Sequence, residues 1–302
     1  MSQHITIDGV HFTYTTLINK VILEDCLSDV PVLKIPEEIN GYKVVQLNGN
    51  FAQNKNYLKE VYIPDSVTAI GKNAFYACKE LKRVKLSNNL KVIPERFCKL
   101  CTGLKEITIP DNVTDIYDGA FSLCYSLLNI KMSENIRTIR LGAFDCCNIK
   151  HFHLGPKFNT VPAFFLKNNS KLQSITVDEN NPYFRDINGI LFSKDASELV
   201  LYPYGLLDRT YIIPRTVKTI GPDAMVNPYL ETVKIYNNLK NIEVGNFPYA
   251  KDLGNTTFIC SEGSCAEEFA KKNNIDIVIS KSTLSEFINS EKMNDKNQEE
   301  TK

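Results

Sequence analysis

Hydrophobic residues along this chain recur with a period of about 23 residues. Residues 58–78, LKEVYIPDSVTAIGKNAFYAC, are matched by residues 104–124, LKEITIPDNVTDIYDGAFSLC, with the apolar, Pro, Ala, Phe and Cys positions in the same order. Periods of roughly 20 to 50 residues are typical of solenoids, whose units bury their apolar faces only against neighbouring units. We therefore expect a stack of similar turns around one continuous core.

Within one unit, the pattern L-x-x-V-x-I-P predicts a short extended strand. Val61 and Ile63 lie on its core side, and Glu60 and Tyr62 lie on the opposite side, because side chains alternate along a strand. Pro64 lacks a backbone N–H and ends the strand. An Ala-Phe-x-x-Cys segment then closes the unit. The expected fold class is a repeat solenoid of mainly short β-strands with short helical or 3-10 turns.

The units have recognisable starts and one long interval. They begin at Leu58, Leu81, Leu104, Leu127, Ile149, Leu172, Asp208, Leu230 and Leu253. The interval from Leu172 to Asp208 is 36 residues and contains ILFSKDASELVLYP, two apolar runs around a polar turn. This pattern predicts a hairpin inserted near residues 186–203.

Both ends of the repeat region carry different sequences. Residues 1–57 contain an Asp-Gly hairpin pattern, ITIDGVHFTY, and a lengthened first unit, so we expect an N-terminal hairpin and capping repeat. The solenoid is expected over residues 58–259. Ser264 and Glu267 have capping-box spacing before AEEFAKKNN, which predicts a C-terminal cap at residues 260–280. Residues 281–302 are polar and predict a flexible tail.

The motif IPxxVTxIGxxAFxxCxxL, present as IPDSVTAIGKNAFYACKEL and nearly again as IPDNVTDIYDGAFSLCYSL, resembles the BspA-type leucine-rich repeat. The resemblance extends from about Leu33 to Ile279. It implies a right-handed curved superhelix and a role in attachment or recognition. Many members of this family are surface proteins, and its motif contains no catalytic residues.

Composition limits the classes of partner. Lys plus Arg and Asp plus Glu both number 35, so the chain has no overall field that attracts nucleic acid or anionic lipid. No stretch approaches the roughly 18 apolar residues of a membrane span, and the first residues do not resemble a signal peptide. We expect a cytoplasmic protein that inserts in no membrane and binds no nucleic acid. The alternative is a cell-surface or secreted protein exported by a route not visible in the sequence.

Nine cysteines and four histidines are the main candidates for site chemistry. Cys78, Cys101, Cys124 and Cys147 recur every 23 residues and predict a buried column. A metal array is one interpretation, but reduced core residues fit better, because a line of sulfurs differs from a tetrahedral zinc site.

The segment CCNIKHFHL suggests a second metal site, formed by Cys146, Cys147, His151 and His153. Inward positions for Phe152 and Leu154 turn both histidines outward, so we expect no metal and no cofactor. No phosphate loop, nucleophile elbow or zinc-protease motif occurs, which predicts a protein that is not an enzyme. An enzyme with an unrecognised site is the remaining alternative.

The outward strand positions form the candidate binding surface, although solvation alone also explains their polarity. Solenoids use such extended faces to bind wide partners, and basic residues outnumber acidic ones here. We therefore expect a monomer that binds another protein, with acidic partners favoured, or an acidic glycan, through this face. The alternative is a structural spacer or surface adhesion element that binds through its ends or its inserted hairpin. The predicted partner-binding residues are Tyr62, Arg83, Lys85, Lys131, His151, His153 and Lys234.

Overall fold

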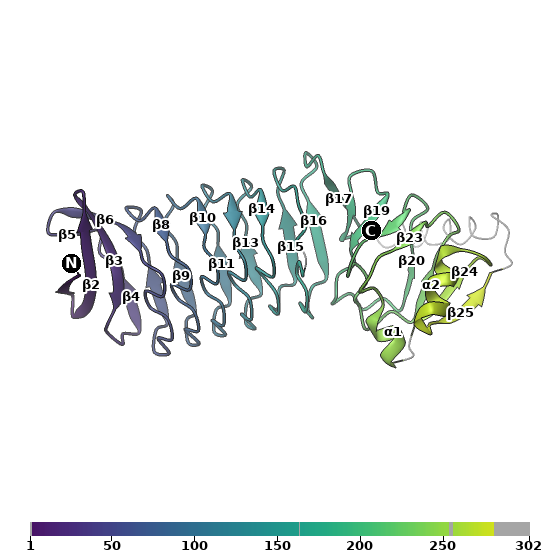
Figure 1. The fold of residues 1–302 in the computed structure, drawn as a ribbon, viewed down its shortest axis with the longest axis horizontal. Coiled ribbons are helices and arrows are strands. Elements are labelled where there is room, and N and C mark those ends of the chain that lie inside the picture. Colours follow the sequence, from purple (N-terminus) through teal and green to yellow (C-terminus); the bar gives the residue numbers. More distant parts are fainter. Residues whose placement is uncertain (1, 163, 254–255, 281–302) are drawn as a thin grey trace, which may run out of the picture.

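The computed structural model describes residues 2–162, 164–253 and 256–280 of the 302-residue chain. The chain winds into a row of similar turns, with a mixed sheet at the N-terminal end and two short helices at the C-terminal end (Figure 1). Residues 281–302, where the sequence predicts a flexible tail, lie outside the described residues. Among the residues that are described, no helix has the length and apolar character needed to cross a membrane.

An N-terminal sheet covers the first turn of the solenoid. Its strand order is β1-β2-β3-β6-β5, and β6 also pairs with β8 of the next turn. The predicted Asp-Gly turn joins β1 to β2, with positive φ at Asp8 (48°) and Gly9 (78°), as a tight hairpin turn requires. The strands are β1 (Gln3–Ile7), β2 (Val10–Leu17), β3 (Lys20–Cys26), β5 (Glu38–Ile39) and β6 (Tyr42–Leu47).

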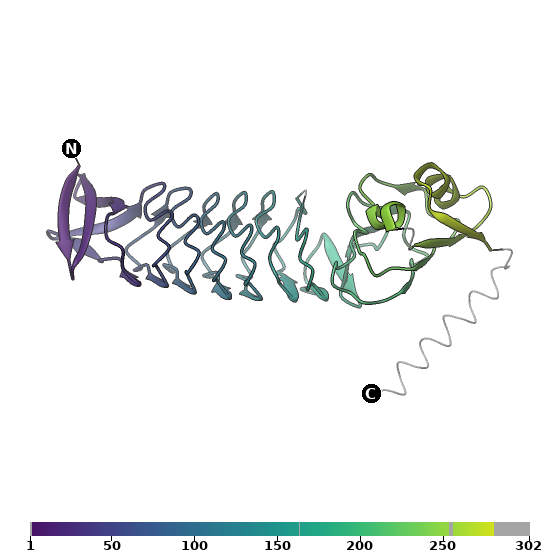
Figure 2. The ribbon, with the colours of Figure 1, turned by 90° about the horizontal axis from the view of Figure 1, so that it is seen from below.

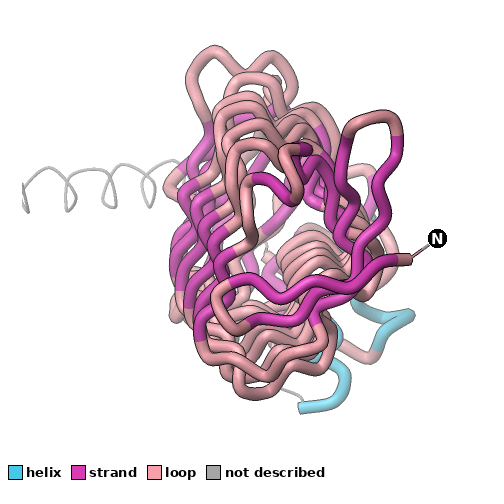
Figure 3. Tube along the Cα trace, turned by 90° about the vertical axis from the view of Figure 1, so that its left-hand side faces the viewer, coloured by secondary structure: helices cyan, strands magenta, loops and turns pink. Residues whose placement is uncertain are grey.

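The turns that follow contribute two series of short strands, which stack along two sides of the solenoid (Figure 3). All of the strand pairs recorded within each series are parallel. The first series is β4 (Val32–Lys34), β7 (Glu60–Tyr62), β9 (Arg83–Lys85), β11 (Glu106–Thr108), β13 (Asn129–Lys131), β15 (His151–Leu154) and β16 (Ser174–Val177). The second is β8 (Ala69–Ile70), β10 (Val92–Ile93), β12 (Asp115–Ile116) and β14 (Thr138–Ile139).

A column of phenylalanine rings runs through the core. The rings of Phe51, Phe75, Phe97, Phe121 and Phe144 are all buried, and successive centroids lie 6.3, 5.5, 6.1 and 5.4 Å apart. In the unit that begins at Leu81, Phe97 comes one residue earlier than the repeat predicts. Its ring still occupies the column, so the sequence departs from the motif there without interrupting the core.

The Ala-Phe-x-x-Cys segments are tight turns that bond both locally and to the next unit. In one of them, Tyr76 N donates to Asn73 O at 3.0 Å, a 3-10-type bond, while Phe75 N donates to Phe97 O at 3.0 Å in the following turn. These backbone bonds between units replace those of a regular helix. Within the described part of the chain, the regular helices are α1 (Pro248–Leu253) and α2 (Cys265–Asn273).

The inserted segment forms three antiparallel strands rather than a two-stranded hairpin. β18 (Ile190–Ser193) and β19 (Glu198–Leu201) are the two apolar runs seen in the sequence, and β17 (Phe184–Ile187) pairs with β18. β19 then pairs in parallel with β21 (Thr219–Ile220), which pairs with β23 (Asn241–Ile242). The hydrophobic core divides into two clusters at this insertion. Two neighbouring residues of β18 mark the division, because Leu191 belongs to the N-terminal cluster and Ile190 to the C-terminal cluster. The even spacing of the turns ends at the same place (Figure 2).

A second parallel sheet and α2 complete the C-terminal part. The sheet contains β20 (Thr210–Ile212), β22 (Thr232–Lys234), β24 (Thr257–Cys260) and β25 (Asp276–Ile279), in that order. Ser264 caps α2 as predicted, because its Oγ accepts from Glu267 N at 3.3 Å. The Glu267 carboxylate accepts from Gly263 N at 2.6 Å, one residue earlier than in the standard capping box.

Candidate interaction surface

The outward side chains of β4, β7, β9, β11, β13, β15 and β16 form one surface, here called the strand face. Along β9, Arg83 and Lys85 are exposed and Val84 between them is buried, and β11 repeats this pattern. Six of the seven predicted binding residues lie on this face: Tyr62, Arg83, Lys85, Lys131, His151 and His153.

Lys234 lies apart from the other six predicted residues. It is on β22, which pairs with β20 and β24 in the C-terminal sheet. β16 does not pair with β20, because its free edge bonds to the inserted segment instead. Ile175 N donates to Gly189 O of that segment at 2.8 Å. Val177 N similarly donates to Asp186 Oδ1 at 2.9 Å. The insertion therefore separates Lys234 from the strand face.

Strand register sorts the strand face into two rows with different charge. Each strand contributes its first outward residue to one row and its second outward residue to the other, as in the pairs Lys34↔Tyr62 and Tyr62↔Lys85. The first row contains the acidic residues Glu60 and Glu106 beside Arg83. The second row contains no acidic residue, and its members are Lys34, Tyr62, Lys85, Thr108, Lys131, His153 and Thr176.

Lys34 belongs to this second row and was not among the predicted residues. Lys34 lies in the lengthened first unit, before the regular units that begin at Leu58. The signal was available, because Leu33 and Ile35 already matched the inward positions of the repeat. Within the described residues, Lys34, Arg83, Lys85 and Lys131 form no ion pair with a carboxylate. Their charges are therefore presented to solvent or to a partner.

Tyr62 lies between the basic side chains and borders two hollows of the strand face. One hollow, of about 440 Å³, lies between β9 and β11, and Arg83, Lys85 and the acidic Glu106 also line it. The other, of about 460 Å³, is lined by Lys34, Tyr62 and Lys85. The Tyr62 hydroxyl donates to Glu60 Oε2 at 2.5 Å, and this hydrogen bond raises the pKa of Tyr62 above its ordinary value. The phenol is thus protonated and held in place at neutral pH.

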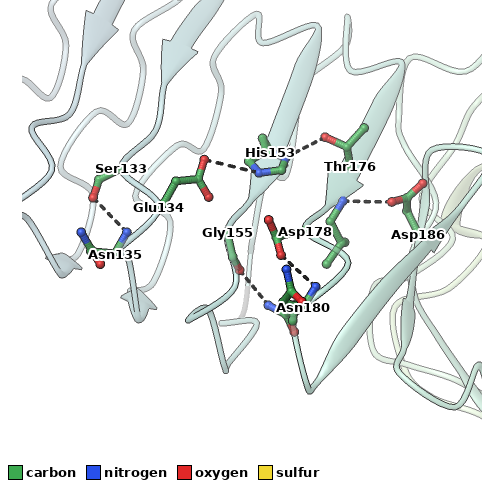
Figure 4. Close-up of polar contacts among 11 residues, drawn as sticks. Ser133, Glu134, Asn135, His153, Gly155, Thr176, Asp178, Asn180 and Asp186 are labelled. Atoms are coloured by element: carbon green, nitrogen blue, oxygen red, sulfur yellow. Dashed lines mark hydrogen bonds and ion pairs between the residues drawn. The ribbon is translucent and has the colours of Figure 1, made fainter.

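His151 and His153 bond along the strand face rather than toward the core. His151 Nδ1 lies 2.8 Å from Ser174 Oγ, and His153 Nδ1 lies 3.0 Å from Thr176 Oγ1. His153 Nε2 is also 3.7 Å from Glu134 Oε1, in the preceding turn (Figure 4). Both rings are therefore oriented by polar neighbours, and the predicted outward placement is confirmed.

The two cysteines of the CCNIKHFHL segment do not converge with these histidines. Cys147 is 2% exposed and its Sγ donates to Phe121 O at 3.2 Å, whereas both histidines are exposed. Within the described ranges, no group of three or more His, Cys, Asp or Glu residues is arranged to hold a metal ion.

The cysteine column is buried and reduced, and it also makes a repeated hydrogen bond. Cys78, Cys101, Cys124 and Cys147 donate to backbone carbonyl oxygens of Ala52, Phe75, Cys98 and Phe121 at 3.0 to 3.2 Å. The position therefore holds a small donor as well as a small apolar group. In the next unit this place is taken by Asn169, whose amide donates to Phe144 O at 2.8 Å.

Thiol labelling of the native protein is expected to spare this column. Burial raises the pKa of Cys78 to about 12 and the pKa values of Cys101 and Cys124 well above the ordinary value, so little reactive thiolate forms. Of the nine cysteines, only Cys146 and Cys265 are partly exposed. Mass spectrometry after brief maleimide treatment should find label on those two alone, and on all nine after unfolding in denaturant. Rapid native labelling of Cys101 or Cys124 would contradict the buried column.

The fold defined by these units is a leucine-rich repeat solenoid, whose apolar strand and turn positions build the core while the strand face stays open. The model of the BspA type leucine rich repeat region matches residues 46–173, 93–198 and 208–294, with six copies. The chain belongs to this family. A comparison with curated proteins finds no significant match.

Solved structures of bacterial leucine-rich repeat proteins are similar to this chain. A leucine rich cell surface protein of Faecalibacterium prausnitzii A2-165 is 25% identical, with a TM-score of 0.61, over 80% of this chain and 72% of that one. The pneumococcal vaccine antigen PcpA is 17% identical, with a TM-score of 0.63, over 93% of this chain and 99% of that one. A leucine-rich repeat protein of Bacteroides ovatus ATCC 8483 is 21% identical, with a TM-score of 0.61, over 85% and 70%. The latter two likenesses concern the fold alone.

Proposed function

We propose that this protein is a non-enzymatic binding module that recognises an acidic protein partner through the strand face. The observation that carries the proposal is the second row of that face, in which Lys34, Lys85 and Lys131 accompany Tyr62 and His153 and no position of the row is acidic. A row of like charges on a rigid face attracts a partner of opposite charge and sets its orientation. The family supports a role in interaction or adhesion.

The arrangement around Tyr62 fits the usual composition of protein interfaces. Tyrosine and arginine are enriched at energetic centres of interfaces, and here Tyr62 and Arg83 line the same hollow. Lys34 and Lys85 border the adjoining hollow. An extended acidic segment lying across these two hollows would contact the ring and all three cations. An acidic glycan is the second candidate ligand, because sulfate or carboxylate groups would meet the same row.

Location is part of the proposal. The cell surface protein of Faecalibacterium prausnitzii has a similar fold. We infer by analogy that this chain also acts at a cell surface, which favours the alternative stated above over a cytoplasmic location. A surface adhesion element that binds through its ends or inserted strands is the competing function.

Charge reversal on the strand face tests the proposed function. Replacing Lys85 and Lys131 together with Glu should weaken binding of an acidic partner by about tenfold or more and reduce the dependence of binding on salt. Thermal unfolding should be nearly unchanged, because substitutions of exposed residues rarely alter stability by more than about 0.5 kcal/mol. Binding is measured first with polyglutamate and heparin, then with proteins captured from cell extract, at two salt concentrations.

The matched control is the double variant Lys72→Glu and Lys79→Glu. Both lysines are exposed on the turn side of the solenoid, and the change in net charge is identical. Equal loss of binding in the two double variants would indicate a general charge effect and contradict recognition by the strand face. Preference for heparin over polyglutamate and over every captured protein would favour the glycan ligand.

A further inference from the structure

A pocket lies where the inserted strands interrupt the stack of turns. Along the turn segments, the backbone bonds between units run as far as Lys167 O, which accepts from Cys146 N, and begin again at Tyr202 N, which donates to Ala224 O. One backbone bond crosses the junction, because Gly205 N donates to Leu172 O at 2.8 Å. In the second strand series, β14 is followed by a single bridge to Thr160, whereas β19 pairs only with β18 and β21. A pocket of about 450 Å³ occupies this junction. Its volume falls within the range of about 300 to 1,000 Å³ typical of ligand pockets.

Aromatic and aliphatic side chains from three segments line the pocket. Val161 and Phe164 come from the turn before the insertion, Phe184 and Val200 from the inserted strands, and Val226 from the turn after it. Val161, Phe184 and Val200 pack against the first hydrophobic cluster on one side, but they are only partly buried, so each leaves apolar surface toward the pocket. An apolar ligand group can therefore be buried there without rearrangement of either core.

Phe164 has an unusual conformation for its residue type. It is 45% exposed and has a φ of 57°, in the left-handed region that is unfavourable for bulky residues. The equivalent residues in other units are Asn73, Arg96, Gly119, Gly142 and Asp223, with φ of 58°, 52°, 59°, 59° and 52°. All of these except Arg96 are Asn, Asp or Gly, the residue types that adopt this conformation most readily. The phenyl ring thus adds conformational strain and exposed apolar surface at the same position, a combination that points to a binding role.

The charged groups at the pocket are mostly acidic. Asp223 Oδ1 is 4.0 Å from Lys167 Nζ, which also lies 4.5 Å from the centroid of the Phe164 ring. Glu198 lines the pocket without an ion pair or side-chain hydrogen bond among the described residues. Its carboxylate lies against Gly221, where a Cβ would approach Oε1 to 2.7 Å. Burial, and then the nearby carboxylates of Glu243 and Asp195, raise the pKa of Glu198 above its ordinary value.

We propose that this junction pocket binds an extended segment of a partner protein that places a lysine or arginine side chain against Glu198 and apolar side chains against Phe164 and Val200. A cation there relieves the repulsion that Glu243 and Asp195 exert on the Glu198 carboxylate. It also pairs with Glu198, which has no ion-pair partner among the described residues. The pocket thus selects a basic and apolar segment, whereas the strand face selects acidic groups, and the two sites are independent.

Two matched peptides test the pocket. The probes are fluorescein-labelled Ser-Leu-Phe-Lys-Phe-Leu-Ser and its counterpart with Glu in place of Lys, and binding to the full chain is followed by fluorescence anisotropy. The lysine peptide is expected to bind saturably and at least about tenfold more tightly than the glutamate peptide. Glu198→Gln should weaken it about fivefold, whereas Glu179→Gln, an exposed carboxylate outside the pocket, should leave it unchanged.

Phe164→Gly separates a binding role from a structural role. It removes the aromatic wall and supplies glycine, which two other units carry at this position as Gly119 and Gly142. It should therefore weaken the lysine peptide while leaving the melting temperature unchanged or higher. Absence of saturable binding, equal affinity for both peptides, or insensitivity to Glu198→Gln would overturn the proposal. A lower melting temperature for Phe164→Gly would show that the ring serves folding and would also overturn it. The strand-face variant with Glu at positions 85 and 131 should still bind the lysine peptide, which keeps the two proposals distinguishable.

Discussion

Replacing Phe97 with alanine is expected to lower the free energy of unfolding by about 3 to 5 kcal/mol, the usual cost of removing a fully buried aromatic ring. Phe97 is completely buried and its ring lies between those of Phe75 and Phe121, at 5.5 and 6.1 Å. Each unit of a solenoid contacts only its neighbours, so a cavity here weakens two interfaces between units. Chemical denaturation followed by circular dichroism measures the change.

A compensating variant provides the control for Phe97. The double change Phe97→Ala and Cys98→Phe restores the Ala-Phe order of the other units and returns a ring to the column. It should recover at least half of the lost stability. A loss below about 1 kcal/mol for Phe97→Ala would contradict a close-packed column, because cavities of this size in a core cost more.

Replacing Asn169 with leucine is expected to cost about 2 to 4 kcal/mol, although the two side chains have the same number of non-hydrogen atoms, because buried polar groups lose hydrogen bonds. The Asn169 amide donates to Phe144 O, Leu166 O and Lys167 O at 2.8, 3.0 and 3.2 Å. Its Oδ1 accepts from Ile149 N at 3.3 Å. Leucine supplies none of these bonds. Leu166 O and Lys167 O keep the bonds that they accept from Asn169 N and Cys146 N, whereas Phe144 O and Ile149 N lose the bonds to the Asn169 side chain.

The conservative control at this position is Asn169→Cys. Cys147 occupies the equivalent place one unit earlier and donates from Sγ to Phe121 O. Cysteine should therefore retain one hydrogen bond to Phe144 O and cost less than leucine in the same denaturation experiment. If leucine were tolerated as well as cysteine, the hydrogen bonds of Asn169 would contribute little to stability.

Much of the fold follows from sequence because each unit repeats the same local pattern. Alternation at Val61 and Ile63 predicted β7, and the two apolar runs of the long interval predicted β18 and β19. The third inserted strand, β17, was not predicted. Its sequence, FRDI, places Arg185 and Asp186 between two apolar residues, so no alternation marks it as a strand. The Asp186 carboxylate instead bonds Val177 N, a contact visible only in three dimensions.

The candidate site was only partly predictable. Outward placement of Tyr62 and Lys85 follows from strand alternation, but separation of the charges into two rows depends on register between units. Lys234 is separated from the strand face because of where the inserted strands pack. The length of the interval from Leu172 to Asp208 does not reveal that position. The donor role of the cysteine column was also missed. Asn169 and Asn227 lie three residues before the first Leu of the next unit, as Cys78 does. The replacement of Cys by Asn at this position indicates that it requires a hydrogen-bond donor.

Zero-length carbodiimide coupling to a captured acidic partner tests the central claim most directly. This reagent joins lysine amines to carboxylates that are already in contact, so each coupled lysine marks a place where the partner lies. We expect the coupled peptides, identified by mass spectrometry, to contain Lys34, Lys85 and Lys131, and coupling to these sites to fall as salt increases. Coupling confined to Lys194 of the inserted strands or to Lys72 and Lys79 of the turn side would contradict recognition through the strand face.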